Sequence, residues 1–258
     1  MSGLIDFLFN GALLSEYGMR LLFGLGTTAK LVGISVGTGF LLAFPLCLAR
    51  MSRRPWIAGP ALAYVTLFRG TPLLCQLYVL YYGAGELRLT LSEAGLWWFF
   101  REAFYCCLFA FALNTAAYQA EIFRGALGAV SRGQREAAQA LGLSRLQVAW
   151  LVVWPQAALV ALRPLGNELI SMIKASALAA IVTLLDLMGQ TRFIFARTFD
   201  FSVYLYAALL YLAVTEAIRR LWNRAERRLS RHLPQAHAAA VREAIPERGV
   251  PGEIATAH

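Results

Sequence analysis

Residues 134–155 read QREAAQALGLSRLQVAWLVVWP, a mixed polar and apolar stretch between two long apolar ones. The stretch begins with strong helix formers, and Gly142 stands where a helix would end, because glycine tolerates the left-handed cap conformation. Ser144 can cap a second helix, and Gln147 three residues later can complete a capping box. Pro155 interrupts or bends that second helix. The stretch therefore predicts a helix, a tight turn and another helix at a membrane surface.

Two interpretations of this helical loop are open from its local chemistry. A rigid helix–turn–helix suits a socket on another protein. An ordinary amphipathic connector between membrane spans would show a similar pattern.

The composition is that of a membrane protein. Of the 258 residues, 59% are hydrophobic, and the mean hydropathy is +0.56. Long apolar runs favour a single polytopic membrane domain over soluble domains. The net charge of +9 fits arginines held on the cytoplasmic side of a membrane. No basic strip interleaved with aromatic residues indicates nucleic-acid binding, and the cysteines lack the spacing and histidine partners of a metal site.

The apolar pattern predicts five membrane spans, at about residues 21–48, 57–82, 103–122, 162–184 and 203–222. Arginine clusters follow the first, third and fifth spans. The helical loop and the C-terminus are therefore expected inside the cell and the N-terminus outside it. The fourth span is interrupted by Pro164, Gly166 and the stretch around Lys174, and broken helices in transporters line water-filled cavities. A division into six spans also remains open.

The chain is expected to have three parts. Residues 1–18 hold only a short apolar run, which predicts an amphipathic segment at the outer interface. Residues 19–232 form the membrane domain, in which residues 83–102 and 190–201 are expected to be external loops. Residues 233–258 are rich in alanine with scattered proline and glycine, which predicts a disordered tail.

No nucleotide-binding or hydrolytic motif is visible in the sequence. The chain has no Gly-x-x-x-x-Gly-Lys-[Ser/Thr] loop to hold phosphates, no nucleophile elbow and no His-Glu-x-x-His helix. An enzyme is therefore not indicated, and an ATPase that drives transport would be another polypeptide.

The helical loop resembles the cytoplasmic EAA loop of permease subunits of ATP-binding-cassette importers. The residues that match its pattern are Glu136, Ala137, Ala138, Gly142 and Pro155, while Val152 and Trp154 stand where Ile and Leu are usual. The resemblance implies that these residues dock into a cleft of the ATP-hydrolysing subunit.

Three further stretches resemble the subfamily that imports polar amino acids and opines. Residues 68–77 contain Arg-Gly-Thr-Pro, and residues 113–126 contain Asn-x-x-Ala-Tyr-x-x-Glu-x-x-Arg-Gly. Gly166-Asn167-Glu168, followed by Ser176-Ala177-Leu178, resembles the pattern around the broken helix. The likeness extends over about residues 18–232, and the chain looks most like the M-type permease of histidine, arginine or opine importers.

The resemblance implies an all-α polytopic protein of the bacterial inner membrane with the type I ABC importer permease fold. Its implied partners are ABC ATPase subunits, which carry ATP and Mg, a second permease subunit that is homologous or identical, and an extracytoplasmic amino-acid-binding protein. No cofactor or metal is expected in this chain. The implied substrate is a polar amino acid of basic character, such as histidine, arginine or lysine, or an opine.

Two ionisable residues in the expected spans are the first candidates for substrate contact, because charge within a bilayer usually faces a cavity or a partner. Arg69 can hold a ligand carboxylate through two hydrogen bonds, and Glu168 can pair with an ammonium or guanidinium. The alternative is a structural ion pair, of Arg69 with Glu121 or of Glu168 with Lys174.

Three polar residues complete the expected substrate path. Thr71, Asn114 and Ser171 can supply hydrogen bonds along the same wall, or they can instead hold helices together. Glu121 and Arg124 lie three residues apart on one helical face, which predicts a structural ion pair.

Two other functions remain as hypotheses. An autonomous channel or ion-coupled amino acid carrier would transport when purified alone under an ion gradient, whereas an importer permease requires an added ATPase. A scaffold without transport activity would leave Arg69 and Glu168 unexplained.

Overall fold

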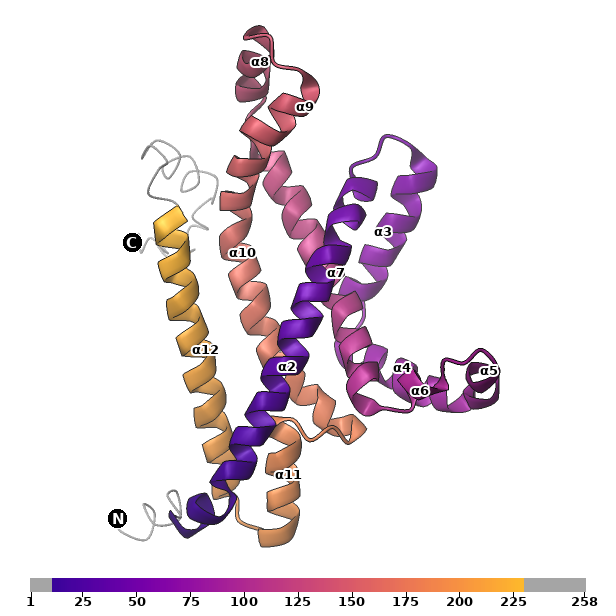
Figure 1. Ribbon diagram of the computed structural model, residues 1–258, viewed down its shortest axis with the longest axis vertical. Helices are drawn as coiled ribbons and strands as arrows, with labels where there is room; N and C mark the ends of the chain where they lie inside the picture. The colour runs from indigo at the N-terminus through magenta and orange to yellow at the C-terminus, as the bar shows by residue number, and fades with distance from the viewer. Residues whose placement is uncertain (1–10, 230–258) are drawn as a thin grey trace, which may run out of the picture.

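The computed structural model describes residues 11–229, which form helices joined by short loops (Figure 1). Within that range, four helical stretches are long and apolar enough to cross a membrane. They contain α2 (Gly11–Arg50), α7 (Ala103–Ala129), α10 (Trp154–Ala175) and α12 (Ser202–Leu229). The predicted all-α membrane architecture is therefore confirmed. The predicted tail at 233–258 lies outside the described residues.

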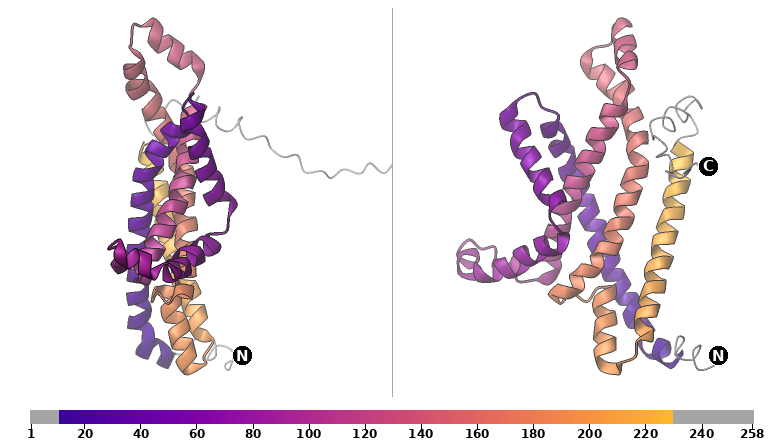
Figure 2. Two further views of the ribbon diagram at one scale, coloured as in Figure 1. Left: turned by 90° about the vertical axis from the view of Figure 1, so that its right-hand side faces the viewer. Right: turned by 180° about the vertical axis from the view of Figure 1, so that it is seen from behind.

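The long helices run side by side, and the molecule is much thinner in one direction than in the others (Figure 2). The end of α2, the end of α12 and the loop around α8 (Arg132–Ala140) lie toward one end of the molecule (Figure 1). The start of α2 lies at the other end. The most extensive packing joins α2 to α7. Gly39 allows it, because a Cβ there would lie 2.3 Å from Cγ2 of Thr115.

The first helix begins earlier than the sequence predicts. Helix α2 already includes residues 11–18, which were expected to form a separate interfacial segment, and residues 1–10 lie outside the described part. Leu13 is buried in a cluster that also contains Leu187 and Ile194 of α11 (Leu187–Thr198) and Tyr206 of α12, so this first turn belongs to the helical bundle. Its 40 residues make a helix about 60 Å long, about twice the bilayer core.

The second expected span is not continuous. It divides at Thr71 into α3 (Pro55–Gly70) and α4 (Leu73–Glu86), neither of which is long enough to be a candidate span. Thr71 is extended (φ −112°, ψ 146°), because the ring of Pro72 disfavours a helical residue before it. The Nε2 group of Gln76 donates to the carbonyl oxygens of Phe68 (2.9 Å) and Thr71 (3.1 Å), which satisfies groups left free by the break. The span prediction was wrong here because this proline ends a helix.

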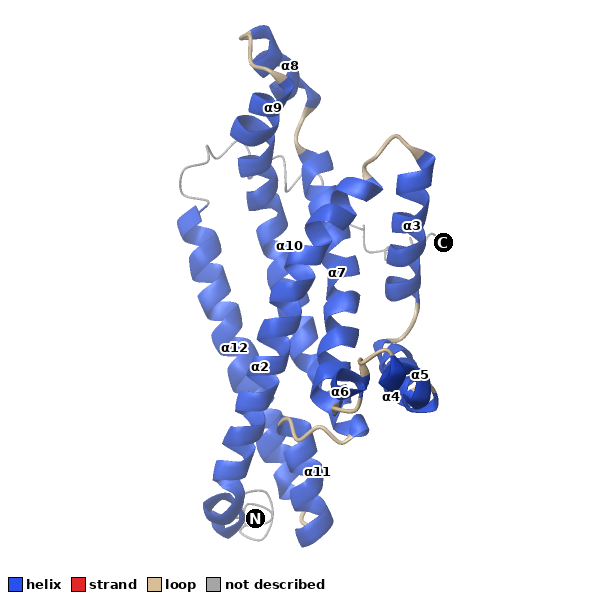
Figure 3. Cartoon of the chain, turned by 45° about the vertical axis from the view of Figure 1, so that its right-hand side comes forward, coloured by secondary structure: helices blue, strands red, loops and turns tan. Residues whose placement is uncertain are grey.

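Two segments expected to be external loops are partly helical (Figure 3). Residues 83–102 contain the end of α4, then α5 (Arg88–Glu93) and α6 (Trp97–Phe100). Residues 190–201 mostly belong to α11 (Leu187–Thr198), which packs against α2. The side chain of Asp186 caps α11 by accepting from the N–H of Gly189 (2.8 Å), a local signal that the hydropathy pattern hides.

The fourth span is longer and less broken than expected. A helical stretch runs from α9 (Arg145–Gln147) through a π-helical run, η1 (Val148–Val153), into α10. Pro155 does not interrupt it, because it lies in the first turn of α10 and follows the π-helical run, whose wider turn accommodates a missing N–H. Pro164 also lies inside α10 without ending it. The expected change near Lys174 is present, since α10 gives way to the 3-10 helix η2 (Ser176–Val182).

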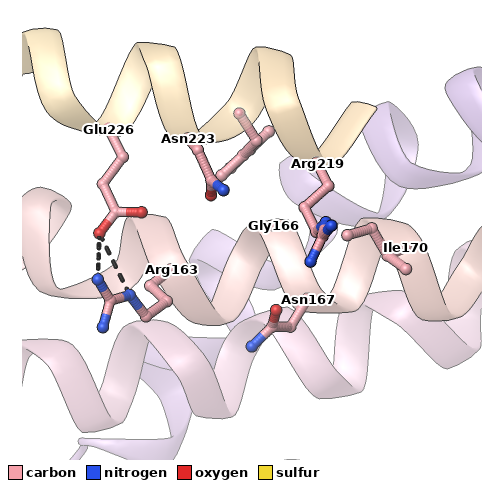
Figure 4. A pocket seen from close by; sticks show the side chains of 8 residues that line it. Arg163, Gly166, Asn167, Ile170, Arg219, Asn223 and Glu226 are labelled. Atoms are coloured by element: carbon pink, nitrogen blue, oxygen red, sulfur yellow. Dashed lines mark hydrogen bonds and ion pairs between the residues drawn. The ribbon is translucent and has the colours of Figure 1, made fainter. Parts of the chain in front are cut away.

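Helix α12 packs against α10 along a groove in which Arg163 and Glu226 point toward each other (Figure 4). A tryptophan of α12 also lies against a glycine of α10. Nε1 of Trp222 donates to the carbonyl oxygen of Leu162 (2.8 Å). A Cβ on Gly166 would lie 2.5 Å from the indole ring, so only glycine leaves room for it. The two side chains of Arg163 and Glu226 close the same groove with an ion pair at 3.0 Å.

Candidate functional site: a polar cavity and a projecting loop

One open cavity of about 540 Å³, named here the large cavity, lies where the α3–α4 break faces α7 and α10. It is lined by Arg69, Gly70, Thr71, Pro72, Leu73, Asn114, Tyr118, Glu168, Ser171, Met172 and Ala175. All five residues expected on the substrate path, which are Arg69, Thr71, Asn114, Glu168 and Ser171, are therefore on its wall. The proline break that the span prediction missed supplies one side of this cavity.

Glu168 enters the large cavity from α10. Its Oε1 accepts a hydrogen bond from Oγ1 of Thr115 (3.0 Å), a residue of α7 that sequence reasoning did not select. Within residues 11–229 no ion pair joins Glu168 to Lys174, so that structural alternative is not observed. The carboxylate therefore keeps acceptor capacity toward the cavity.

Arg69 lies in the last turn of α3 and also lines the large cavity. Its guanidinium lies 5.2 Å from the centre of the Tyr118 ring, in a cation–π contact. Its Nη1 is 4.0 Å from Oε2 of Glu121, an ion pair too long for a hydrogen bond. The structural alternative for Arg69 is thus present, but it occupies the guanidinium only loosely. The side chain is 43% exposed.

Thr71 and Asn114 are tied to the helix break through Gln76. Nδ2 of Asn114 donates to Oε1 of Gln76 (3.0 Å) and to the carbonyl oxygen of Phe68 (3.1 Å). Nε2 of Gln76 donates to Oγ1 of Thr71 (2.8 Å). Sequence reasoning missed Gln76, although it lies in the stretch that contains Arg-Gly-Thr-Pro. These contacts fix the shape of this part of the wall. Ser171 lies three residues after Glu168 on α10, and its side chain is exposed.

A second cavity of about 390 Å³, named here the Glu121 cavity, adjoins the first. It is lined by Arg50, Leu62, Val65, Thr66, Arg69, Gly70, Tyr118 and Glu121. Oε1 of Glu121 accepts from Nε of Arg50 (3.1 Å), and its Oε2 accepts from Nη2 of Arg124 (2.7 Å). The predicted pair of Glu121 and Arg124 is therefore confirmed.

The helical loop of residues 134–155, called here the projecting loop, has the predicted backbone. Gly142 has φ +83° between α8 and α9, with no atom within 4 Å of a Cβ built on it. Oγ of Ser144 accepts from the N–H of Gln147 (3.4 Å), and the Gln147 side chain accepts from the N–H of Ser144 (2.9 Å). This is the capping box that the sequence predicts. A side chain at position 142 would meet no neighbour, so the reason for glycine here is the positive φ of the backbone.

Around this turn, apolar side chains are exposed and the EAA residues are divided between surface and core. Leu141 is 83% exposed and Leu146 69% exposed. Ala138 is buried in a cluster that also contains Val148, whereas Glu136 and Ala137 are exposed. The loop therefore exposes apolar side chains above a buried cluster, an arrangement that suits docking into a cleft of another protein.

Comparison with known proteins agrees with this geometry. The sequence profile of the family described as binding-protein-dependent transport system inner membrane component matches residues 22–231. The nopaline transport system permease protein NocM of Agrobacterium fabrum is 39% identical over 222 residues, which are 86% of this chain and 92% of that protein. The histidine/lysine/arginine/ornithine transport system permease protein HisM of Escherichia coli K12 is 37% identical, with 86% and 96% covered.

Solved structures give the same assignment. A chain in the crystal structure of an amino acid ABC transporter with histidines superposes with a TM-score of 0.75 at 35% identity, covering 83% of this chain and 96% of that one. The inward-facing MetNI methionine ABC transporter superposes with a TM-score of 0.67 at 19% identity, covering 83% and 97%, which shows a shared fold.

Proposed function

Because the chain belongs to the family of binding-protein-dependent transport system inner membrane components, we propose that it carries a basic amino acid or an opine across the cytoplasmic membrane. The observation that supports this substrate class most directly is that Arg69 and Glu168 both line the large cavity. An autonomous carrier is disfavoured, since the family and the relatives consist of ABC permease subunits.

The chemistry of the large cavity matches both ends of such a ligand. The loosely held guanidinium of Arg69 binds the ligand carboxylate through paired hydrogen bonds. The carboxylate of Glu168 accepts from the ligand's ammonium, guanidinium or imidazolium, while Ser171, Thr71 and Asn114 orient it. Two relatives are named for the transport of nopaline and of histidine, lysine, arginine and ornithine. A ligand of this class carries the groups that the cavity would bind.

Transport is driven by ATPase subunits that bind the projecting loop. Gly142 and the capped turn present Leu141 and Leu146 to a cleft of the ATPase. Ala138 anchors the loop in the core, and Glu136 and Ala137 are exposed beside it. Pro155 lies in the first turn of α10. ATP and Mg belong to that partner. A binding protein delivers the ligand on the other side of the membrane.

A second permease subunit covers the open side of this one. Asn167, Ser171 and Lys174 are exposed along α10, at positions inside a candidate membrane span. A polar stripe of this kind is unfavourable against lipid, so it faces an aqueous path or another subunit. Two such chains enclose the path that one chain leaves open.

The N-terminus faces outward and the C-terminus inward. Arginines after α2, in α8 and at the end of α12 gather at the end of the molecule that carries the projecting loop (Figure 1). Such an excess of arginine marks the cytoplasmic side.

Reconstitution into liposomes tests the proposal. The permease complex, its ATPase and its binding protein should accumulate radiolabelled arginine, histidine or octopine only with ATP. Omission of the ATPase should abolish uptake even under a proton or sodium gradient. Uptake by the permease alone under an ion gradient would refute the proposal in favour of a carrier.

A further inference from the structure

The two cavities meet at one arginine. Arg69, Gly70 and Tyr118 line both the large cavity and the Glu121 cavity. Their volumes, about 540 and 390 Å³, both lie within the range of about 300–1,000 Å³ that holds small ligands. Arg69 therefore stands between two spaces of ligand size.

The Glu121 cavity carries an excess of positive charge. Arg50, Arg69 and Arg124 surround the single carboxylate of Glu121, which leaves a net charge of about +2 among the four groups. Glu121 and Arg50 form a shielded pair, with side chains 12% and 17% exposed, whereas Arg69 and Arg124 are 43% and 44% exposed. The excess charge is therefore partly solvated and lies where a ligand can reach it. An added carboxylate would be stabilised there.

The three arginines are not held equally. Arg50 and Arg124 donate hydrogen bonds to Glu121 at 3.1 Å and 2.7 Å. Arg69 lies 4.0 Å away and makes no hydrogen bond within the described residues. Its hydrogen-bond donors are therefore available to a ligand, and the Tyr118 ring, 5.2 Å from its Cζ, lines both cavities.

We propose that the Glu121 cavity is a second ligand subsite, which receives the carboxylate of the amino acid as it leaves the large cavity. This rests on the proposed function. The guanidinium of Arg69 stays paired with the ligand carboxylate while it turns from one cavity to the other, and Arg50 then adds a second positive charge. Glu168 faces only the large cavity, so the cationic end of the ligand leaves last.

The position of the second subsite fits an exit. Arg50 is the last residue of α2 and lies toward the end of the molecule that carries the projecting loop (Figure 1). That end is the proposed cytoplasmic side. The subsite would therefore be visited after the large cavity during import.

Arg50→Gln separates binding from release. Radiolabelled arginine should bind the purified complex without ATP within about twofold of wild type, because Arg50 does not line the large cavity. ATP-driven uptake should fall about tenfold or more, as expected when one charge-assisted hydrogen bond is lost. The control is Arg101→Gln, which removes the same charge from an exposed pair with Glu102 that lines neither cavity. Wild-type uptake by Arg50→Gln would overturn the proposal, and so would loss of binding in this variant.

Cysteine labelling shows whether the ligand visits the subsite. Thr66→Cys, in a chain with Cys75→Ser, places a thiol in the Glu121 cavity and outside the large cavity. Arginine should slow its alkylation by a maleimide, whereas agmatine, which lacks the carboxylate, should not. Ala63→Cys, an exposed α3 position that lines neither cavity, is the matched control.

The two proposals fail in different ways. Equal labelling of Thr66→Cys with and without arginine would overturn the second subsite, while ATP-driven uptake by wild type would leave the proposed function intact. Absence of that uptake would overturn the proposed function itself.

Discussion

One helical stretch, residues 145–182, begins in the projecting loop and later borders the large cavity, and both regions reverse the usual placement of polarity. At the loop, Leu146 and Trp150 are exposed where the chain leaves the membrane region. In the cavity, Glu168 and Ser171 lie inside the span. Neither surface is favourable alone. In the proposed function each surface is completed by a partner: an ATPase for the loop, and a charged ligand and a second subunit for the cavity.

The two regions differ in what fixes their shape. The loop is set by its own backbone, through the positive φ of Gly142 and the capping box of Ser144. The shape of the cavity is fixed by hydrogen bonds between α4, α7 and α10. Asn114 donates to Gln76, and Thr115 donates to Glu168. Substitutions in the loop should therefore act through conformation, and those in the cavity through charge.

The largest expected effect is that of Glu168→Gln. The amide keeps the shape but removes the charge, so binding of arginine should weaken roughly ten- to hundredfold, in line with about 1.5–3 kcal/mol for one charge-assisted hydrogen bond. Equilibrium binding of radiolabelled arginine to the purified complex measures this. Unchanged affinity would remove Glu168 from the ligand site. Because no pair with Lys174 is observed, adding Lys174→Met should not restore uptake.

Gly166→Ala tests the packing of α12 on α10, the helix that borders the large cavity. The new methyl group would meet the Trp222 ring, and overpacking of this kind destabilises a protein by about 1–3 kcal/mol. The complex in detergent should melt at a lower temperature, followed by intrinsic fluorescence or by aggregation. Pairing it with Trp222→Leu should recover part of the loss, and a melting temperature unaffected by Gly166→Ala would contradict the tight contact.

Gly142→Val should uncouple ATP hydrolysis from uptake without altering ligand binding. A β-branched residue opposes φ +83° by about 1–2 kcal/mol, which lowers the fraction of loops in the docking conformation by roughly tenfold. Gly142→Asn is the matched control, since asparagine tolerates positive φ. The measurement is the ratio of arginine imported to ATP hydrolysed. Equal ratios for the two variants would show that the side chain's bulk matters and not the backbone.

The smallest effect is expected for Glu226→Gln. The variant breaks the pair with Arg163, whose side chain is 73% exposed, and surface pairs of this kind contribute about 0.2–1 kcal/mol. The melting temperature should shift by at most a few degrees, and uptake should stay near wild type. A large loss would mean that this groove is buried against another subunit.

The sequence predicts the loop in atomic terms and the cavity only as a set of residues. Ser144 and Gln147 bond to each other three residues apart, and the positive φ of Gly142 is set at a single residue, so local rules suffice for the turn. The five cavity residues were chosen for their charge or polarity inside expected spans, and the structure places them together. Their partners Thr115 and Gln76 come from other helices, and no local pattern pairs them with Glu168 or Asn114.

The errors have a common physical origin. Hydropathy treats residues 57–82 as one apolar run, although Pro72 ends a helix there. The proline rule predicts an interruption or bend at Pro155, although the π-helical run before it accommodates the missing N–H. Hydropathy also indicates a loop at α11, because the polar residues of this capped helix lower its hydropathy. Hydropathy reports the surroundings of a segment, whereas backbone hydrogen bonding decides where a helix begins and ends.

The π-helical run Val148–Val153 preserves the angle between the two regions. Each residue of an α-helix advances the chain by about 100° around its axis, and a π-helical turn accommodates one additional residue within the same turn. Deleting a single residue here would therefore restore regular α-helical winding and leave the face carrying Leu146 nearly in phase with the face carrying Glu168. A deletion in a regular α-helical part of this stretch would instead rotate the two faces by about 100°. The run thus absorbs a change of one residue in length, and homologous chains that are one residue shorter here should keep the same docking direction.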